Sequence, residues 1–411
     1  MSLVLNDINI VNFLTLRYDP TFTNLHAPLK SDYFVEKEIG NLDSEIENIV
    51  RVDLESKLSQ KKVSKVSLAL SGGIDSRFTI AMIRKHFPEI YIDSICVGFG
   101  DDDDEISEAR KVAQQYDSDF HELIVDNALK DLPKLISITG MPKWNLYQFY
   151  FLDQATKYSR VFFSGDGGDE IFGGYIFRYK KFLQEVEKIK NPSWLDKSKI
   201  YLSCHNRDWV PNQEDIFNKN VGFSWFQIYE NFRPYFDNHL HPLNQLFHAD
   251  FNGKLLHDWI PTNDNFGKHF GLEINSLFLN PRMITLAASL PWHVKYDYSQ
   301  NIGKLPLLSL LNKGSGSSKF EGFKKGFSLN LLNLWKNYGR EIVLLYLNEN
   351  SDSVKNNIIN LKWIEDSIRL VDSTNHSDMK IRYVSKLLSI LSFEIWYRLF
   401  VSSTLKANIR L

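Results

Sequence analysis

The sequence predicts an α/β fold, a doubly wound parallel sheet followed by a mostly helical C-terminal half. From residue 49 to about residue 180, short apolar runs alternate with helix-like segments. Such alternation is typical of parallel sheets whose strands are joined by helices. Two glycine-rich segments each follow one of the apolar runs, at the strand ends where ligands bind in doubly wound folds. After residue 181 the strand pattern fades and longer helical patterns take over.

The expected elements of the α/β part follow one another in regular order. We expect strands at residues 66–70, 91–97, 120–124 and 160–163. The intervening helices are expected at residues 49–58, 77–86, 105–115 and 146–158. In the C-terminal half, helical patterns are clearest at residues 283–289 and 378–400.

These patterns divide the chain into two unequal parts. Residues 1–48 show no clear period and are expected to form an N-terminal appendage or connector. Residues 49–411 are expected to form one large domain, with an α/β core at about 49–180 and a helical part at about 181–411.

The composition is that of a globular protein with little net charge. Hydrophobic residues make up 43% of the 411 residues, and the formal net charge is -2. This charge gives no broad attraction to nucleic acid or to an anionic membrane, so neither is expected as a partner. The two cysteines, Cys96 and Cys204, are too few for a disulfide framework, and neither a membrane span nor a signal peptide is evident. We expect a cytoplasmic protein.

The first glycine motif, Ser71-Gly72-Gly73-Ile74-Asp75-Ser76, lies between an apolar strand and a helix start. Consecutive glycines let the backbone approach a ligand closely, and the N-terminus of the following helix attracts anions. We therefore expect a phosphate-binding loop, although one different from the Walker loop G-x-x-x-x-G-K-S/T. The alternative is a plain strand-to-helix turn in which Asp75 and Ser76 cap the helix.

The second glycine motif follows the apolar run 161–163 and reads Ser164-Gly165-Asp166-Gly167-Gly168-Asp169-Glu170-Ile171-Phe172-Gly173-Gly174-Tyr175. The two motifs resemble the pyrophosphate loop and the S-G-x-G-x-D-E-x-F-G-G-Y segment of the asparagine synthetase family, which belongs to the N-type ATP pyrophosphatases. Shorter matches follow in the family's order at residues 97–99, 271–273, 278–282, 289–291, 303–304, 324–327 and 390–400. The resemblance extends from about residue 50 to the C-terminus.

The resemblance implies an enzyme that binds ATP and Mg²⁺ and cleaves ATP between its α and β phosphates. Asp75 and Asp169 would bind Mg²⁺, because two carboxylates together with phosphate oxygens suit this ion. As alternatives, Leu70 and Val97 are also what any buried strand contains, and Asp169 is also a suitable cap for a short helix. The ATP-binding residues would be Leu70, Ser71, Gly72, Gly73, Asp75, Ser76, Val97, Gly98, Gly165 and Lys304.

Lys324 and Asp166 are the two residues to which the resemblance gives a catalytic role. Lys324 matches the lysine of the family's K-x-G-F segment, which contacts phosphate and stabilises charge, and Lys325 beside it is the competing assignment. Asp166 stands where many asparagine synthetases have Glu, and an acid there suits a general base or an ammonium-binding group. The alternative for Asp166 is a loop-stabilising Asx role.

The glutaminase domain of the family is not expected in this chain. Glutamine-dependent asparagine synthetases begin with a cysteine nucleophile, whereas residue 2 here is Ser2, and only about 65 residues precede the phosphate loop. We therefore expect nitrogen to come from ammonia, from an amine on the substrate, or from a separate glutaminase subunit. The oligomeric state stays open, a homo-oligomer included.

Departures from the family pattern bear on the acyl substrate. Asn265, Asn280 and Met141 stand where the family usually has Arg, Asp and an acidic residue. The loss of these charges favours a carboxylate other than aspartate, either a small molecule or a peptide. A nearby aromatic stretch is expected either to line the substrate pocket or to belong to the core, and it comprises Trp144, Tyr147, Phe149, Tyr150 and Phe151.

The leading hypothesis is an ATP-dependent, AMP- and pyrophosphate-forming amide ligase that adenylates a carboxylate and transfers nitrogen to it. Ammonia-dependent synthesis of asparagine is the nearest alternative. An RNA- or base-modifying enzyme of the same superfamily is another, although neither Cys96 nor Cys204 fits catalytic sulfur transfer. A nucleotide-binding subunit without activity is the last, and the intact set of acids and lysines argues against it.

Overall fold

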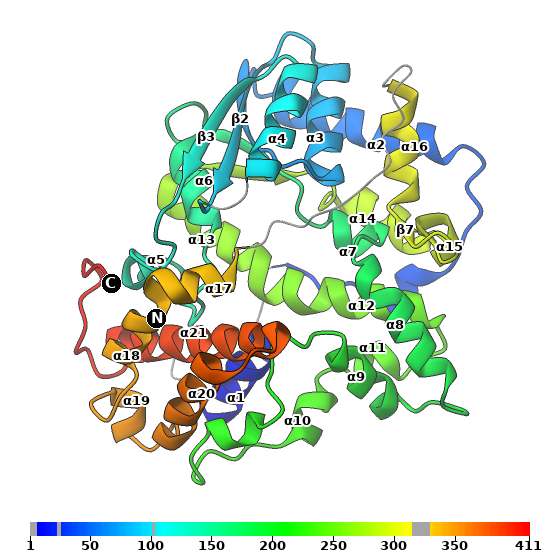
Figure 1. Ribbon diagram of the computed structural model, residues 1–411. Helices are drawn as coiled ribbons and strands as arrows, with labels where there is room; N and C mark the ends of the chain where they lie inside the picture. Colours follow the sequence, from blue (N-terminus) through cyan, green and yellow to red (C-terminus); the bar gives the residue numbers. More distant parts are fainter. Residues whose placement is uncertain (1–5, 23–25, 101–102, 315–328) are drawn as a thin grey trace.

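The fold is built on a five-stranded parallel sheet (Figure 1). The computed structural model describes residues 6–22, 26–100, 103–314 and 329–411. The strands lie in the order β3-β2-β1-β4-β5, and every neighbouring pair is parallel. Their bounds are β1 (Lys65–Ala69), β2 (Tyr91–Gly98), β3 (Asp119–Ile124), β4 (Val161–Ser164) and β5 (Glu273–Ser276). The α/β prediction is therefore confirmed, and the first four strands agree closely with their predicted positions.

The predicted helices of the α/β part are also present, with shifted ends. The helix predicted at residues 49–58 begins earlier, because the side chain of Asn41 accepts a hydrogen bond from the Ser44 amide and caps it. The sequence did not predict a helix at residues 132–139. The helices of this part are α2 (Leu42–Leu54), which continues as the π-helical turn η2 (Glu55–Ser59), α3 (Ile74–His86), α4 (Asp103–Gln115), α5 (Leu132–Thr139) and α6 (Gln148–Ala155).

The edge strand β5 was not predicted from the sequence. It has four residues and includes the polar Glu273 and Asn275, so it lacks the apolar run that marks the other strands. It pairs with β4, with Phe163 opposite Asn275 in the register. The helical half of the chain therefore supplies one strand of the sheet, next to the strand that carries the second glycine motif.

The rest of the described chain is mostly helical, as expected. The helices predicted at residues 283–289 and 378–400 are confirmed as α14 and α21. No helix in the described residues combines the length and apolar character needed to cross a membrane. The helices are α7 (Gly168–Phe172), α8 (Ile176–Glu187), α9 (Trp194–Ser203), α10 (Trp225–Glu230), α11 (Arg233–Phe236), α12 (Pro242–Asp250), α13 (Ile260–Phe270), α14 (Pro281–Ser289), α15 (Trp292–Lys295), α16 (Leu305–Gly314), α17 (Leu331–Leu334), α18 (Arg340–Tyr346), α19 (Asp352–Lys355), α20 (Leu361–Ser373) and α21 (Ser377–Phe400).

Short irregular elements complete the fold. The hairpin formed by β6 (Tyr296–Asp297) and β7 (Ile302–Gly303) is antiparallel and separate from the main sheet. The remaining short helices are the 3₁₀ helices η1 (Ser31–Phe34) and η3 (Gln213–Ile216) and the π-helical segments η4 (Phe251–Trp259) and η5 (Trp335–Gly339).

The N-terminal region begins with a buried helix, α1 (Asp7–Leu16), that packs against α21. Ile10, Val11 and Leu14 are each at most 5% exposed. The ammonium of Lys386 on α21 donates to the backbone carbonyl of Leu14. This part of the expected appendage is therefore packed into the helical half of the molecule.

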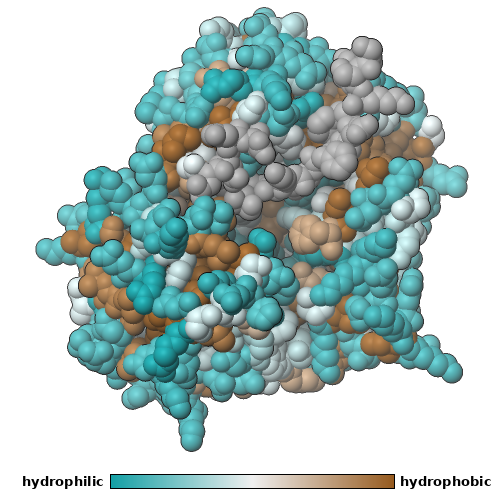
Figure 2. All heavy atoms as spheres, viewed as in Figure 1, coloured by the Kyte–Doolittle hydropathy of each residue, from teal (hydrophilic) through white to brown (hydrophobic). Residues whose placement is uncertain are grey.

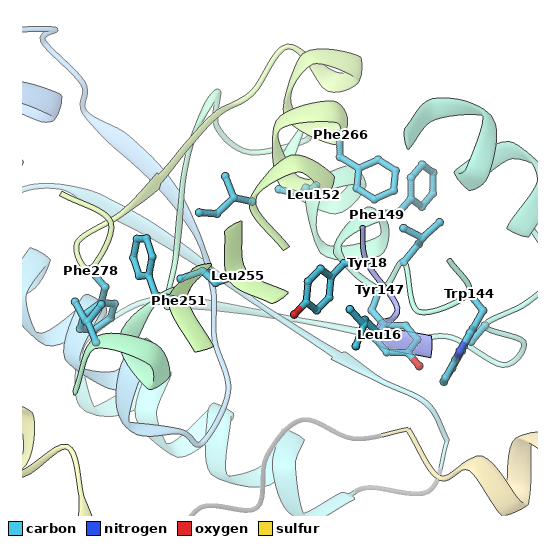
Figure 3. Packing of buried hydrophobic residues seen from close by; sticks show 14 of the residues in the cluster. Leu16, Tyr18, Trp144, Tyr147, Phe149, Leu152, Phe251, Leu255, Phe266 and Phe278 are labelled. Atoms are coloured by element: carbon cyan, nitrogen blue, oxygen red, sulfur yellow. The ribbon is translucent and has the colours of Figure 1, made fainter. Parts of the chain in front are cut away.

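The aromatic stretch after α5 mainly belongs to the core (Figure 3). The ring of Phe149 lies 5.6 Å from that of Phe266 on α13, and Phe151 stacks on Phe162 of β4 at 5.7 Å. Trp144 and Tyr147 lie beside Leu16 in Figure 3, where the N-terminal segment meets this stretch. These contacts favour the core assignment for Phe149 and Phe151.

Candidate functional site

The first glycine motif lies directly after β1 and leads into α3. The amide of Ser71 donates to Oγ of Ser76 at 3.1 Å, and Oγ of Ser76 donates to the Ser71 carbonyl at 3.0 Å. Gly73, which has no side chain, occupies the N-cap position of the 13-residue helix α3. The two hydroxyls and the first amides of α3 thus lie together, an arrangement that suits phosphate oxygens.

The second glycine motif packs against the first because its glycines leave room for Asp75. A Cβ atom on Gly165 would lie 2.7 Å from Cβ of Asp75, and one on Gly168 would overlap with the Asp75 carboxylate. Gly167 has a φ of +90°, a left-handed conformation that favours glycine. The motif glycines therefore bring the loop after β4 next to the loop after β1.

Lys304 joins the two motifs through an ion-pair triad with Asp75 and Asp169, called here the acid–lysine triad. Its Nζ lies 2.5 Å from Oδ2 of Asp75 and 2.5 Å from Oδ1 of Asp169. The lysine directly follows the β6–β7 hairpin, and its amide donates to the Phe172 carbonyl at 3.1 Å. Lys304 is only 2% exposed.

The charge of Lys304 is held by the two acids. Burial would lower the pKa of this lysine, but Asp169 and Asp75 outweigh that effect and raise the pKa above its ordinary value. Gly174 completes the arrangement, because a Cβ atom there would overlap with Asp169 and with Cε of Lys304. Lys304 therefore lies as a buried cation between the two acids that were predicted to bind metal.

The two acids fit a Mg²⁺ ion that takes its other ligands from a phosphate. The described residues contain no group of three or more His, Cys, Asp or Glu side chains arranged to hold a metal. Asp75 and Asp169 supply carboxylate oxygens, which are hard ligands that Mg²⁺ accepts, and this ion commonly keeps phosphate oxygens or waters in its other positions. An ion bound here would neutralise phosphate charge.

Asp166, predicted as a general base, accepts hydrogen bonds at both carboxylate oxygens. Trp259 Nε1 donates to Oδ1 at 2.5 Å, while Asn263 Nδ2 and Ser164 Oγ donate to Oδ2 at 2.7 and 2.6 Å. Burial raises the pKa of Asp166, whereas these three donors act to lower it. The contacts tie the second motif to η4 and α13, which fits the loop-stabilising alternative. The general-base role stays a prediction.

The predicted nucleotide-binding residues on β1 and β2 are largely covered. Leu70 and Val97 are 3% and 6% exposed, and a Cβ atom on Gly98 would lie 2.6 Å from Cδ1 of Ile106. Their positions at the carboxyl ends of neighbouring strands suit a nucleotide site, yet their burial equally matches ordinary core packing. Lys324 and its competitor Lys325 lie outside the described residues.

Several residues around the site were missed by the sequence reasoning. Trp259 and Asn263 bind Asp166 from elements far along the chain, and no local pattern marks them. Tyr175 donates from its hydroxyl to Oε1 of Glu170 at 2.6 Å. Glu170 and Tyr175 both belong to the second motif, so the matched segment could have revealed this contact.

The two glycine motifs lie at the carboxyl ends of β1 and β4. The arrows of β2 and β3 in Figure 1 point towards the middle of the molecule. Figure 2 shows that hydrophilic residues cover most of the described surface seen from this side. The glycine motifs therefore lie where ligands bind in doubly wound folds.

Known proteins are similar to this sequence over large parts of its length. The profile of the family described as asparagine synthase matches residues 57–398. A protein of Mycobacterium tuberculosis, named as a candidate glutamine-hydrolysing asparagine synthetase, is 22% identical over 426 residues, covering 93% of this chain and 63% of its own length. The glutamine-hydrolysing asparagine synthetase of Mus musculus is 27% identical over 194 residues, 43% of this chain and 34% of the mouse protein. The chain thus spans less than two-thirds of either relative.

One solved structure, the U34-tRNA thiolase NcsA from Methanococcus maripaludis, shares 16% identity and covers 57% of this chain and 82% of its own. Its TM-score of 0.27 is too low to support an argument. The family match, in contrast, supports a conclusion. It covers residues 57–398, which include both glycine motifs, Lys304 and most of α21. The chain belongs to the asparagine synthase family.

Proposed function

We propose that this protein is an ATP-dependent amide ligase that forms AMP and pyrophosphate. A carboxylate oxygen of the substrate attacks the α-phosphorus of ATP, the bond to the β-phosphate breaks, and pyrophosphate leaves. A nitrogen nucleophile then attacks the acyl carbon of the acyl-adenylate, loses a proton and displaces AMP. Ammonia and an amine on the substrate are the two candidate nucleophiles.

The observation that carries this proposal is the convergence of both glycine motifs on Lys304. The motifs lie 88 or more residues apart in sequence, and Lys304 follows more than a hundred residues later, yet Asp75, Asp169 and Lys304 form one triad. A site that cleaves ATP between the α and β phosphates must hold and neutralise the pyrophosphate that leaves. The phosphate loop and the triad supply amides, hydroxyls and charge for that purpose.

Each group in the site has a separate proposed role. Ser71, Ser76 and the first amides of α3 bind the phosphate oxygens. Asp75 and Asp169 hold Mg²⁺, which when bound neutralises charge on the pyrophosphate. Lys304 keeps the two acids together and limits their repulsion. Lys324 is proposed to contact phosphate from its K-x-G-F segment.

Two residues that depart from the family pattern bear on whether the acyl substrate is aspartate or another acid. Asn265 donates from Nδ2 to the Thr139 carbonyl at 3.1 Å, and Asn280 donates from Nδ2 to Oδ1 of Asp53 at 2.7 Å. The side chain of Asn280 also caps α14. These two departures from the family pattern therefore serve packing here. The loss of charge at these positions is what supports a dedicated carboxylate as the proposed substrate, with asparagine formation as the competing outcome.

Sulfur transfer to RNA is disfavoured by the chemistry of both cysteines. Burial raises the pKa of Cys96 to about 12 and also raises the pKa of Cys204. A thiol needs to ionise before it acts as a nucleophile. Neither cysteine is therefore prepared for catalytic sulfur chemistry.

Pyrophosphate release coupled to product identification tests the proposal. The protein, MgATP and ammonium are incubated either with ¹⁸O-carboxyl aspartate or with an unlabelled small-molecule cell extract. AMP, its ¹⁸O content and pyrophosphate are then measured. Formation of AMP is expected, and where aspartate is the substrate this AMP carries ¹⁸O, since the attacking carboxylate oxygen stays on the phosphorus. Asp169→Asn should abolish it, whereas Asp366→Asn, on an exposed face of α20, should not. Release of ADP in place of AMP would contradict the proposal.

A further inference from the structure

Lys143 is a buried cation that joins the segment before α6 to the segment η4. It is 4% exposed, and its ammonium forms an ion pair with Oδ1 of Asp258, which is 6% exposed. The same ammonium donates to Oγ1 of Thr262 at 3.1 Å. A buried ion pair adds little net stability compared with apolar side chains of the same size. This pair is therefore better explained by the residues that it holds in place.

The two residues that the lysine ammonium contacts each precede a residue that binds Asp166. Asp258 precedes Trp259, whose Nε1 donates to Oδ1 of Asp166 at 2.5 Å. Thr262 precedes Asn263, whose Nδ2 donates to Oδ2 of the same carboxylate at 2.7 Å. One lysine thus fixes the immediate neighbours of both donors, which come from η4 and α13.

The backbone that carries these donors is irregular. The segment η4 is π-helical, and Gly253 within it departs from helical geometry, with φ of -88° and ψ of -110°. At the junction of η4 with α13, the hydroxyl of Thr262 donates to the Asp258 carbonyl at 2.6 Å. π-Helical turns are rare and occur frequently at functional sites. Because the helix is interrupted at Gly253, the position of Trp259 depends on side-chain contacts such as the ion pair of Asp258.

The segment that carries Lys143 is itself fixed by the long helix α21. Trp396 Nε1 donates to the Gly140 carbonyl at 2.8 Å, and Ser392 Oγ donates to the Pro142 carbonyl at 3.1 Å. Trp396 and Ser392 are at most 1% exposed. Lys143 therefore connects a segment held by the buried helix α21 to the residues that bind the carboxylate of the second glycine motif.

We propose that Lys143 is a positioning residue for Asp166. Its ion pair with Asp258 holds Trp259 and Asn263 where they fix both oxygens of the carboxylate. This inference rests on the proposed ligase function, in which Asp166 binds or deprotonates the nitrogen nucleophile. Loss of the ion pair then slows nitrogen transfer and spares adenylation, which depends on the phosphate loop and the acid–lysine triad.

The hydrogen bond from Trp259 to Asp166 can be observed without turnover. A short bond from an N–H donor to a carboxylate moves the proton signal downfield. The indole signal of Trp259 in a ¹H–¹⁵N spectrum of the full chain, assigned with Trp259→Phe, should therefore move upfield in Asp166→Asn. Lys143→Met should move the same signal upfield by at least about half as much. An unchanged Trp259 signal in folded Lys143→Met would overturn the proposal.

A double variant keeps the test valid if Lys143→Met fails to fold. Removing the lysine alone leaves a buried carboxylate without its partner, which is strongly destabilising. Lys143→Met combined with Asp258→Leu removes both charges and keeps apolar volume, so the fold should be retained. The Trp259 signal should again move upfield. An unmoved signal in this variant, with native circular dichroism, would also overturn the proposal.

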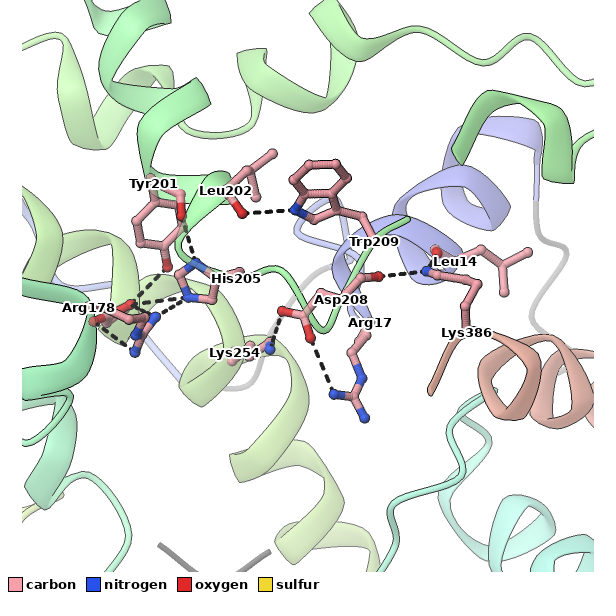
Figure 4. Close-up of polar contacts among 11 residues, drawn as sticks. Leu14, Arg17, Arg178, Tyr201, Leu202, His205, Asp208, Trp209, Lys254 and Lys386 are labelled. Carbon is pink, nitrogen blue, oxygen red and sulfur yellow. Dashed lines mark hydrogen bonds and ion pairs between the residues drawn. The ribbon is translucent and has the colours of Figure 1, made fainter. Parts of the chain in front are cut away.

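A second ion pair on η4 supplies the matched control (Figure 4). Lys254 pairs with Oδ2 of Asp208, whose Oδ1 lies 3.2 Å from Nη1 of Arg17. Lys254 and Trp259 both belong to η4, so the control removes a charge from the same segment. Lys254→Met should leave the Trp259 signal in place. A shift as large as that in Lys143→Met would mean that any disturbance of η4 has this effect, and would overturn the specific role of Lys143.

Two rates separate positioning from a general loss of structure. Exchange of labelled pyrophosphate into ATP measures adenylation, and release of AMP with ammonium present measures the complete reaction, with aspartate or the small-molecule extract as the acid source. Lys143→Met should keep exchange within twofold of the wild type and lower AMP release at least tenfold, as should Asp166→Asn. Combining the two changes should lower AMP release by no more than a further twofold. Equal losses of exchange and AMP release would overturn the proposal.

The spectrum and the rates distinguish failure of this inference from failure of the proposed function. A Trp259 signal that moves in Lys143→Met, without pyrophosphate exchange or AMP from any acid source, would refute the ligase function and leave the contact between Lys143 and the Asp166 site. AMP release that is unaffected by Lys143→Met in an active enzyme would refute the positioning role and leave the ligase function.

Discussion

Replacing Lys304 with methionine tests the electrostatic balance of the acid–lysine triad. The change keeps an aliphatic side chain and removes an ammonium that lies 2.5 Å from both Asp75 and Asp169. The lysine side chain is 2% exposed and the two acids are 17% and 16% exposed, so solvent screens the group poorly. Removing one partner of a buried ion pair costs about 3–5 kcal/mol. We expect Lys304→Met to lower the free energy of unfolding by about 3 kcal/mol or more.

Urea unfolding followed by circular dichroism, with EDTA present, measures this loss. Lys313→Met, which changes an exposed lysine on α16, should have little effect and serves as the control. Asp169→Asn combined with Lys304→Met should cost less than the sum of the single changes, because Asp169→Asn removes the repulsion between the two acids that Lys304→Met creates. Added Mg²⁺ should stabilise Lys304→Met more than the wild type, since it restores positive charge between the acids.

The reasoning about the triad would be refuted by either of two results. A loss below about 1 kcal/mol in Lys304→Met would mean that the ammonium is not a buried partner of the acids. Strict additivity of Lys304→Met and Asp169→Asn would mean that the two groups do not interact.

Three further changes test other parts of the site. Gly174→Ala should lower the thermal unfolding midpoint sharply, because the added Cβ would overlap with the triad. Gly222→Ala is the control, since no atom lies within 4 Å of its added Cβ, and equal midpoints for the two variants would contradict this reasoning. Burial raises the pKa of Glu170 from 4.5 to about 8, so the folded state keeps a proton that the unfolded state releases, and stability should fall from pH 5 to pH 8. Urea unfolding should show a flatter profile in Glu170→Gln, and parallel profiles would argue against the shift. Trp259→Phe removes the donor to Asp166 and should cost about 1–3 kcal/mol in urea unfolding, so an unchanged stability would show that this bond is unimportant.

The sequence predicted the strands and the phosphate loop because their signals are local. Apolar runs mark β1 to β4, and each glycine motif directly follows such a run. The family resemblance added Lys304, which no local pattern would have connected with Asp75. The structure brings these two residues together although they are 229 positions apart in the chain.

The parts that could not be predicted depend on contacts between distant segments. β5 is short and partly polar, so only its pairing with β4 makes it a strand. α1 is buried almost all round, so it has no polar face to give a helical period. The hydrogen bonds of Asp166 and the charges around Asp208 join elements from separate parts of the chain, and no spacing in the sequence indicates them.

The products of ATP cleavage test the central claim most directly. The protein is incubated with MgATP, ammonium and a small-molecule cell extract, and nucleotides and phosphates are quantified, with Asp75→Asn as the control. The account predicts AMP and pyrophosphate in equal amounts, with both lost in Asp75→Asn. Formation of ADP and orthophosphate, or no ATP cleavage, would contradict it.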